Sequence, residues 1–322
     1  MSLSRDELLR IERLRELFLD EGRGEQRLPD YWRDERDLQA YDRVLAARIG
    51  WKWDAVLAEC RDRGLPRADQ RLVVDFGCGS GIAAARFTHW FGAGRVLLHD
   101  RSAAAMGFAC TALRQQQPAI AAAVAPDLRD VHPDVLLMSH VLGELDPAGL
   151  TGLTDLLARS HTVVIVEPGT RTIARRLAAL RDRLLDSWHV LAPCPHRQTC
   201  PTLADGTDWC HFFATPPAAV FTDGELVRSA RAVGIDARSL PYSFLALTRT
   251  PPPTPPPSAR GLGRADVTAH AAHVRLCTAN GLQRVTIDKR SQSQPWRELK
   301  RHPEALRQWP IPGGPADGES QR

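Results

Sequence analysis

The stretch that decides the fold of this chain is Asp75-Phe76-Gly77-Cys78-Gly79-Ser80-Gly81. It follows the short apolar run Leu72–Val74 and opens an alanine-rich segment. Glycines at alternating positions permit a tight turn and let a ligand approach the backbone closely. The pattern predicts a buried strand, a ligand-binding loop and a helix in succession. The alternative is a tight turn between a strand and a helix that binds nothing.

Three more apolar runs follow this loop, and the segments between them are helical in pattern and rich in alanine or leucine. The runs are Val96–Asp100, Val135–Met138 and Val163–Glu167. Continuously apolar strands that alternate with helices are typical of a parallel sheet with helices on both faces. We therefore expect an α/β fold.

An acidic residue stands where a sheet of this kind binds a ribose. Asp100 ends the second strand, 19 residues after Gly81. A carboxylate at that place can accept hydrogen bonds from both ribose hydroxyls. Cys78, inside the loop, is expected to pack against its neighbours and not to act as a nucleophile.

The glycine loop resembles motif I of the class I S-adenosylmethionine-dependent methyltransferases, and it lacks the G-x-G-x-x-G spacing of the dinucleotide fingerprint. The resemblance covers about Arg71–Thr250 and implies a Rossmann-like class I methyltransferase sheet that binds S-adenosyl-L-methionine. It places the glycines under the methionine part, the second acid on the ribose, and the first acid in the loop or against the cofactor's ammonium group. The cofactor-binding residues that it implies are Asp75, Gly77, Gly79, Gly81 and Asp100.

The residues that would carry catalysis are not evident. In amino methyltransferases an Asn/Asp-Pro-Pro-aromatic motif after the fourth strand orients the target nitrogen. The corresponding segment here, Met138–Glu144, has neither the prolines nor the aromatic residue. His140 or Glu144 could act as a general base, and a polar role in the core or on the surface is the alternative. The catalytic residues are therefore left unassigned.

Four cysteines form a candidate ligand set. Cys194, Cys200 and Cys210 are separated by five and nine residues, and Cys277 is remote. Zinc and iron–sulfur clusters both take thiolates, and structural zinc sites usually place roughly two to four residues between paired cysteines. The wider spacing favours a bulkier cluster, while zinc and unliganded thiols stay open.

Other side chains near this set have secondary roles. His196 and His211 lie beside the clustered cysteines and are reserve ligands. Cys60 and Cys110 fall in helical patterns and are expected to be buried as small hydrophobic residues.

The residues around the cysteines resemble a methyltransferase-like family associated with the small ribosomal subunit, the bacterial and mitochondrial relatives of methyltransferase-like protein seventeen. The similar segments are Cys194-Pro195-His196, Cys200-Pro201, Asp208–Phe212, the hairpin around Cys277, Leu28–Trp32 and Ala40-Tyr41. The resemblance spans about residues 28–290 and implies a [4Fe–4S] site on Cys194, Cys200, Cys210 and Cys277. It also implies a role in assembly of the small subunit or in translation, with 16S-type ribosomal RNA as a partner.

The chain is expected to have four parts. A helical region spans residues 1–66, and Gly50 is expected to break its second helix. A methyltransferase-like domain spans 67–250 and carries a Cys-rich, metal-binding insert at 188–213. A proline-rich linker at 251–258 should be extended and stiff. A β-hairpin and tail occupy 259–322, with Asn280-Gly281 as the hairpin turn.

Composition bounds the class of protein. The chain has 322 residues, of which 43% are hydrophobic and 25% charged, and this excludes global disorder. No run approaches the roughly 20 apolar residues that span a bilayer, and the N-terminus lacks the apolar core of a signal peptide. We expect a cytoplasmic monomer with no membrane partner, in which the seven cysteines form no structural disulfides.

Three classes of function fit these observations. The first is an active methyltransferase that acts on ribosomal RNA or a ribosomal protein. The second is a non-catalytic assembly or translation factor that binds the same cofactors. The third, a small-molecule methyltransferase, leaves the Cys-rich insert unexplained.

The net charge of +4 does not by itself indicate nucleic acid. A local basic stretch predicts contact with RNA phosphates, with a solvated surface as the alternative. Its residues are Arg284, Lys289, Arg290, Arg297, Lys300 and Arg301, opposed by Asp288 and Glu298.

Overall fold

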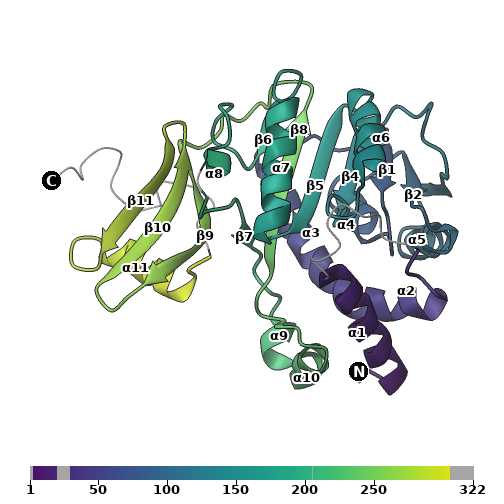
Figure 1. The fold of residues 1–322 in the computed structure, drawn as a ribbon, viewed down its shortest axis with the longest axis horizontal. Helices are drawn as coiled ribbons and strands as arrows, with labels where there is room; N and C mark the ends of the chain where they lie inside the picture. The colour runs from purple at the N-terminus through teal and green to yellow at the C-terminus, as the bar shows by residue number, and fades with distance from the viewer. Residues whose placement is uncertain (1–2, 20–29, 205, 305–322) are drawn as a thin grey trace. The chain divides into compact units, whose positions relative to one another are not determined.

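The computed structural model describes residues 3–19, 30–204 and 206–304, which form two compact units (Figure 1). The first unit holds Met1–Arg61, Pro66–Glu167 and Thr215–Leu240, and the second holds Asp62–Leu65, Pro168–Ala214 and Pro241–Arg322. The four-part division expected from the sequence stays a prediction.

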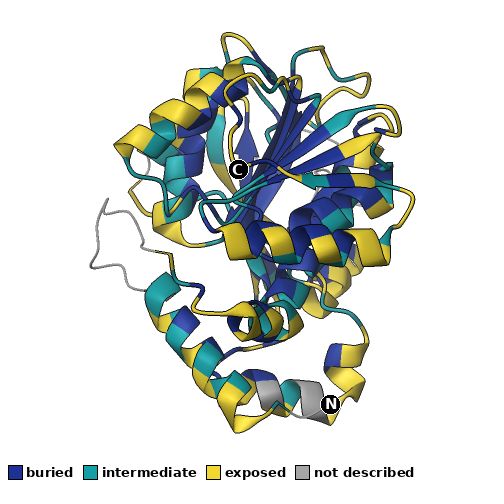
Figure 2. Cartoon of the chain, turned by 90° about the vertical axis from the view of Figure 1, so that its right-hand side faces the viewer, coloured by how far each residue is buried: buried dark blue, intermediate teal, exposed yellow. Residues whose placement is uncertain are grey.

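A parallel sheet forms the centre of the first unit. Its strands are β1 (Leu72–Phe76), β2 (Arg95–His99), β3 (Ala121–Val124), β4 (Val135–Ser139) and β5 (Thr162–Pro168). They lie in the order β3-β2-β1-β4-β5, and every adjacent pair is parallel. Figure 2 shows the strands mostly buried, between helices whose outer sides are exposed. The α/β fold with a parallel central sheet is thereby confirmed.

The order of the strands reverses between β1 and β4, which both lie in the middle of the sheet. Open α/β sheets bind ligands outside the carboxyl ends of the strands at such a switch point. The loops that follow β1 and β4 are therefore the ones that the topology brings to one place.

Helices alternate with these strands. They are α4 (Ile82–Phe91), α5 (Ala103–Gln116) and α6 (Pro147–Ala158). Two of them begin at side-chain caps, because the Ser102 hydroxyl accepts a hydrogen bond from Ala105 N and the Asp146 carboxylate accepts one from Gly149 N. Pro147 follows at the first helical position of α6, where its missing N–H costs nothing.

The N-terminal region is helical, as predicted. Its elements are α1 (Arg5–Leu19), α2 (Glu35–Tyr41), the π-helical turn η2 (Asp42–Ala46) and α3 (Ala47–Asp62). The expected capping box is present, since Glu7 N donates to Ser4 Oγ and Ser4 N donates to a Glu7 carboxylate oxygen.

The predicted break at Gly50 is wrong, because Gly50 lies inside α3. The irregular turn is η2, eight to four residues earlier. A Cβ at position 50 would lie 2.8 Å from Arg86 Nε and 3.1 Å from Ile82 Cδ1. The glycine therefore serves the close packing of α3 against α4 and does not end a helix.

Two short helices close the first unit. They are α9 (Ala219–Thr222) and α10 (Gly224–Ala232). Val220, Val233 and Ile235 share a buried cluster with Ile11 of α1 and Ala40 of α2. Segments far apart in the sequence are thus joined in one core.

The second unit contains α7 (Arg171–Leu184), β6 (His189–Ala192), α8 (Pro201–Ala204), β7 (Phe212–Phe213) and β8 (Pro241–Thr248). Strand β8 pairs antiparallel with both β6 and β7. The Cys-rich insert at 188–213 therefore carries β6, α8 and β7.

An antiparallel sheet follows the proline run. Its strands are β9 (Ala259–Val267), β10 (Ala271–Thr278) and β11 (Gly281–Asp288), in the order β11-β10-β9. The predicted hairpin is formed by β10 and β11. Its turn is Ala279-Asn280, one residue earlier than predicted, because Gly281 already pairs with Thr278 as the first residue of β11. Sequence reasoning missed β9, because its glycines and arginines give no regular alternation of apolar and polar residues.

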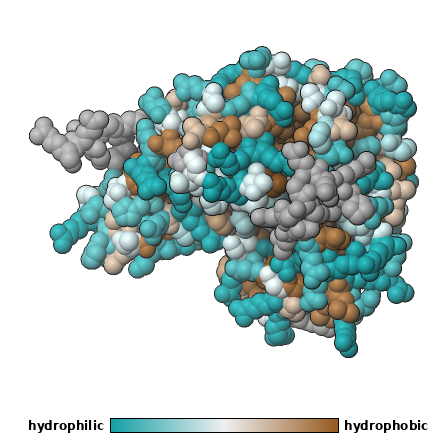
Figure 3. All heavy atoms as spheres, viewed as in Figure 1, coloured by the Kyte–Doolittle hydropathy of each residue, from teal (hydrophilic) through white to brown (hydrophobic). Residues whose placement is uncertain are grey.

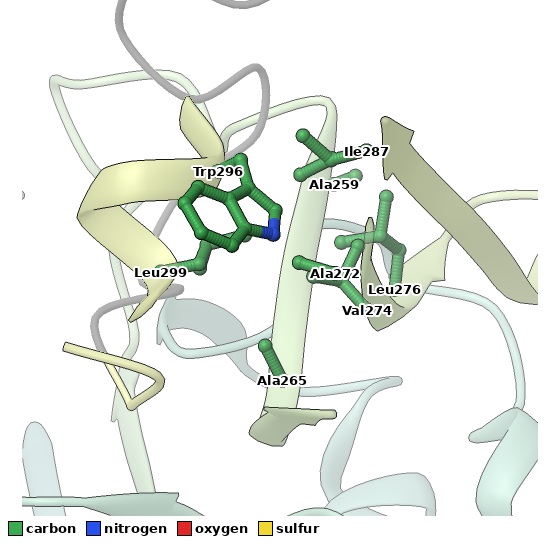
Figure 4. Close-up of a cluster of buried hydrophobic side chains, with 8 residues drawn as sticks. All are labelled: Ala259, Ala265, Ala272, Val274, Leu276, Ile287, Trp296 and Leu299. Carbon is green, nitrogen blue, oxygen red and sulfur yellow. The ribbon is translucent and has the colours of Figure 1, made fainter. Parts of the chain in front are cut away.

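A last helix, α11 (Ser293–Arg301), covers one face of this sheet. Trp296 and Leu299 of α11 pack against side chains of all three strands, among them Ala265, Val274 and Ile287 (Figure 4). The sheet thereby has a small hydrophobic core of its own. None of the helices in the described residues is both long and apolar enough to cross a membrane.

Candidate functional site

The glycine loop connects β1 to α4, as predicted. Its three glycines all have positive φ, at 71° for Gly77, 51° for Gly79 and 85° for Gly81. Residues that carry a side chain rarely adopt this left-handed backbone conformation. The backbone conformation itself therefore favours glycine at these positions.

The three glycines differ in what surrounds them. A Cβ at Gly77 would lie 2.4 Å from a methyl group of Val141, and one at Gly81 would lie 2.9 Å from the Ala109 side chain. A Cβ at Gly79 would meet no atom within 4 Å. Packing accounts for the first and third glycine, and the second faces open space.

The loop is held from β2, and Asp100 is brought to it. His99 O accepts hydrogen bonds from Gly77 N at 2.8 Å and from Cys78 N at 2.9 Å. One carboxylate oxygen of Asp100 accepts from Gly79 N at 3.0 Å, and the other accepts from Ser102 N at 2.9 Å. Sequence reasoning thus identified an acid that lies directly beside the second glycine.

Asp75 lies fully buried beneath the loop. Its Oδ2 accepts a hydrogen bond from Ala84 N at 3.0 Å, and its Oδ1 has no hydrogen-bond partner among the described residues. Burial raises the pKa of the carboxyl to about 7. Burial also raises the pKa of the Cys78 thiol, with Asp75 adding to the effect, so this thiol stays protonated.

The segment after β4 forms the facing wall. Glu167, 1% exposed at the end of β5, accepts hydrogen bonds at 2.9 Å from both Val141 N and Leu142 N. Glu167 thereby fixes the backbone that presses Val141 onto Gly77. Sequence reasoning missed Glu167, although an acid at the end of an otherwise apolar strand was a usable signal.

The two candidate bases have different surroundings. His140 has a φ of 58°, uncommon for a residue other than glycine, and its Nε2 is buried without a hydrogen-bond partner among the described residues. Burial, Lys52 and Arg48 lower the pKa of its imidazole, which is therefore neutral. Glu144 lies 3.4 Å from the Tyr31 hydroxyl and 3.4 Å from an Arg101 nitrogen.

A lysine from α3 belongs to the same neighbourhood. Lys52 is 7% exposed, and burial, aided by Arg48 and opposed by Glu167, lowers the pKa of its ammonium group to about 7. No sequence motif marks Lys52, because a lysine in a helical pattern normally reaches solvent.

Aromatic residues of the N-terminal region gather beside Asp100 and Glu144. Tyr31, Trp32 and Tyr41 contact one another edge to face or at a tilt, and the Arg101 guanidinium lies 4.9 Å from the centre of the Tyr31 ring. Burial raises the pKa of Tyr31, and Glu144 adds to the effect. Leu28 and Pro29 of the similar N-terminal segment lie outside the described residues.

The four cysteines singled out in the sequence converge in the second unit. Cys194 follows β6, Cys200 precedes α8, Cys210 precedes β7, and Cys277 lies on β10. Burial raises the pKa of the Cys210 thiol, and the other three cysteines all add to the effect. Burial likewise raises the pKa of Cys277 to about 12, with contributions from Cys194 and Cys200. The thiols therefore share one buried neighbourhood.

Two buried arginines stand beside these thiols. Arg181 of α7 and Arg260 of β9 are each 2% exposed. Arg181 lowers the pKa of Cys194 and of Cys277, and Arg260 lowers that of Cys194 and of Cys210, in each case against the larger effect of burial. Sequence reasoning missed both arginines, since the chain is rich in arginine throughout.

Arg181 also organises the loop that holds the first two cysteines. Its guanidinium donates hydrogen bonds of 2.6 Å to the carbonyl oxygens of His196 and Gln198. The neighbouring Asp182 accepts a hydrogen bond from Cys200 N at 2.9 Å. Helix α7 therefore shapes this loop through polar contacts to its backbone.

The reserve ligands lie differently. Cys277 Sγ is 3.4 Å from His196 Nε2, so His196 adjoins the thiols. His211 is stacked on Trp209 and lies against Gly263. In the described part of the chain, no group of three or more His, Cys, Asp or Glu side chains is arranged to hold a metal ion. All seven cysteines are free thiols.

Comparison with known proteins gives a family and a set of similar structures. Residues 46–304 match the family described as mitochondrial small ribosomal subunit Rsm22. No curated protein sequence matches the chain.

Several of the similar structures are methyltransferases by name. A precorrin-6y C5,15-methyltransferase from Geobacter metallireducens is 14% identical over 62% of this chain and 87% of that chain, with a TM-score of 0.37. A ribosomal protein L11 methylase from Lactobacillus delbrueckii subsp. bulgaricus is 17% identical over 62% and 79%, with a TM-score of 0.36. An S-adenosylmethionine-dependent methyltransferase from Geobacter sulfurreducens, in complex with S-adenosyl-L-homocysteine, is 17% identical over 62% and 90%, with a TM-score of 0.35. At scores this low we take the fold from the strand order and the function from none of these structures.

Proposed function

This chain belongs to the Rsm22 family, and we propose that it binds S-adenosyl-L-methionine and acts on, or assembles, the small ribosomal subunit. Its nucleic-acid partner in this proposal is 16S-type ribosomal RNA. The proposal has three separable parts, which are the cofactor in the glycine loop, the centre held by the four cysteines, and the choice between catalysis and assembly.

The open space at Gly79 is the observation that carries the cofactor proposal. Gly77 and Gly81 are required by packing, whereas nothing in the protein occupies the place of a side chain at Gly79. Asp100 already accepts a hydrogen bond from Gly79 N, so it lies where a ribose would meet it. The unpartnered Oδ1 of Asp75 adds an acceptor beneath the loop, which suits a ligand that carries an ammonium group.

Calorimetric titration of the purified protein with S-adenosyl-L-methionine and with S-adenosyl-L-homocysteine tests this part. Saturable binding of both supports it, because the two ligands share the adenosine and the amino-acid part. The absence of binding would mean that the loop is only a turn.

For the second part, we propose that Cys194, Cys200, Cys210 and Cys277 hold a [4Fe–4S] cluster, with zinc as the alternative. Four thiolates carry more negative charge than either a zinc ion or a four-iron core neutralises. The buried Arg260 lies beside the thiols, and so does the buried Arg181, which is ion-paired with Asp182. The residue types of the donor set and these cations support an anionic thiolate centre, while the described side chains are not themselves arranged to hold a metal ion. When bound, such a centre would cross-link the insert to β10.

The choice between cluster and zinc rests on spacing. A single ion needs its four ligands at about 2.3 Å from one point, whereas a four-iron cluster spreads its thiolates over separate irons. Five and nine intervening residues in the insert, and a fourth ligand on another element, suit the wider arrangement. Anaerobic purification followed by iron, sulfide and zinc analysis decides between them, and a metal-free protein after reconstitution would contradict both.

For the third part, a non-catalytic assembly or translation factor has its own support. The segment after β4 lacks the amino-methyltransferase motif, and Glu144 already contacts Tyr31 and Arg101. The left-handed His140 with its buried, neutral imidazole supports catalysis instead. Incubation with isolated small subunits and labelled cofactor separates the two, because only an enzyme transfers the label.

A further inference from the structure

The C-terminal sheet has two faces of opposite character. Alternate residues of a strand point to opposite faces. Ala272, Val274 and Leu276 of β10 belong to the cluster under α11, so His273 and Arg275 point to the other face. Figure 4 shows the α11 side, which is apolar.

The face away from α11 carries charged residues of both signs. Asp266 of β9 lies directly opposite His273, and Asp288 of β11 lies two residues beyond Thr286 on this face. On this face Arg275 lies directly opposite Arg284 of β11, and His273 lies opposite Thr286. Like charges directly opposite each other destabilise a sheet. An ion pair with Asp208 compensates the charge of Arg275 and so offsets this repulsion. Arg284 is exposed, and no acidic side chain in the described ranges pairs with it.

Strand β9 adds a further cation beside an aromatic ring. Arg264 is exposed, and its guanidinium lies 4.0 Å from the centre of the Phe213 ring. Phe213 contacts His211 edge to face at 5.6 Å, and His211 stacks on Trp209 at 4.6 Å. These three rings, at alternate positions of one extended segment, are all partly exposed. The intervening Cys210 and Phe212 take the other side.

Apart from Arg284, the basic stretch expected from the sequence lies on α11 or just before it. The ammonium groups of Lys289 and Lys300 lie 4.6 Å and 5.0 Å from the centre of the Trp296 ring on α11. Arg301 is 3.5 Å from Glu298. The two lysines thus lie over Trp296 as Arg264 lies over Phe213, and Arg290 is exposed. Figure 3 shows mostly hydrophilic residues over the C-terminal sheet on the side that it presents.

We propose that the sheet face opposite α11 binds single-stranded RNA, with Arg264 and Arg284 on the phosphates and the Trp209–His211–Phe213 rings beside the bases. Exposed sheets that combine cations with aromatic rings are a recurrent way to bind single strands. A phosphate at Arg284 would give a partner to the member of the cross-strand pair that has no acidic partner among the described residues. The proposal rests on the proposed function, which supplies RNA as the partner.

Fluorescence anisotropy of the full chain tests the face, with a labelled single-stranded RNA of roughly 12 nucleotides, a length within the site sizes of single-strand-binding folds. The double variant Arg264→Ala/Arg284→Ala should weaken binding by about tenfold and lower the slope of log K against log salt by about 1.4, the value for two lost phosphate contacts. The matched control Lys289→Ala/Lys300→Ala removes equal charge from the α11 side and should change affinity by less than about twofold. Arg284→Lys should retain most of the binding.

The outcomes are distinguishable. If the unchanged protein binds no RNA, the partner in the proposed function fails together with the face. If it binds and only the lysine variant weakens binding, the face is wrong and the stretch at 289–301 is the RNA surface. Equal competition by duplex RNA or by polyglutamate would overturn the assignment to single-stranded RNA. Thermal melting curves check that the arginine variant is as stable as the unchanged protein. Because both arginines are exposed, their loss should leave the melting temperature unchanged, and a change in RNA affinity then reflects binding alone.

Discussion

The glycine loop and the four-cysteine region differ in how the chain builds them. Asp75 and Asp100 are 25 positions apart and sit on two adjacent strands, and the loop between them is held mainly by backbone hydrogen bonds. Cys194 and Cys277 are 83 positions apart and meet only because the antiparallel sheet returns to the insert. A site made from one strand–loop–helix unit can be recognised in the sequence, whereas a site made from four elements depends on how they pack.

The largest effect is expected from a substitution at Cys277, the cysteine that is remote in sequence from the other three. Cys277→Ser should abolish retention of the metal centre, because thiolate binding of this kind contributes on the order of 10–16 kcal/mol to metal-coupled folding. It should also loosen β10, where Cys277 is buried. Iron, sulfide and zinc content, with absorbance at roughly 400 nm for a cluster, is the measurement.

The control for this prediction is Cys60→Ser, which changes a fully buried cysteine of α3. Metal content should stay the same even though stability falls. Equal metal content in the Cys277 and Cys60 variants would show that the remote cysteine is no ligand.

The next largest effect is expected from a substitution at Gly79, the glycine of the loop that faces open space. Gly79→Arg should reduce affinity for S-adenosyl-L-methionine by at least about a hundredfold, because the side chain takes the place proposed for the ligand. The left-handed backbone should cost about 1–2 kcal/mol of folding stability, which leaves the protein folded. Calorimetry gives the affinity.

A matched variant is Gly152→Arg, at a position of α6 where a side chain also meets nothing within 4 Å. Its affinity should equal that of the unchanged protein. Retained binding in Gly79→Arg would remove the cofactor from this loop.

A smaller effect separates two glycines of the same loop. Gly77→Ala places a methyl group 2.4 Å from Val141, whereas Gly79→Ala places one in open space. Both substitutions place a side chain on a left-handed backbone and so lower the free energy of unfolding. Gly77→Ala should lower it by roughly 1–3 kcal/mol more than Gly79→Ala, because its methyl group overpacks the contact with Val141. Denaturant titration without ligand measures the difference, and equal stabilities would contradict the packing role of Gly77.

The last effect concerns pH and the buried lysine. The pKa of Lys52 is about 7 in the folded protein and 10.5 as its ordinary value. Between these values the unfolded chain binds more protons than the folded one, so Lys52 makes stability rise with pH from about 7 to 10.5. Relative to Lys52→Met, the unchanged protein should gain stability across this window. Chemical denaturation at several pH values checks the sign, and a constant difference would mean that Lys52 stays charged.

The sequence by itself determined the parallel sheet, the glycine loop, the acid at its side and the four cysteines as a set. These follow from patterns that are local or chemically rare, such as apolar strands of fixed length, glycines at alternating positions and clustered thiols. Because β1 and β2 are neighbours in the sheet, Asp100 at the end of β2 lies beside Gly79 in the loop after β1.

Tertiary structure alone decided the roles of the common residues. Gly50 reads as a helix breaker and proved to be a packing site against α4. Lys52, Glu167, Arg181 and Arg260 became buried partners of the two sites, although their residue types are usually found in water. Strand β9 formed because β10 and α11 offered it a pairing edge and a core, not because its sequence alternates. The physical reason is the same in each case: burial and charge pairing depend on what the rest of the chain brings to a position, and a window of sequence does not contain that.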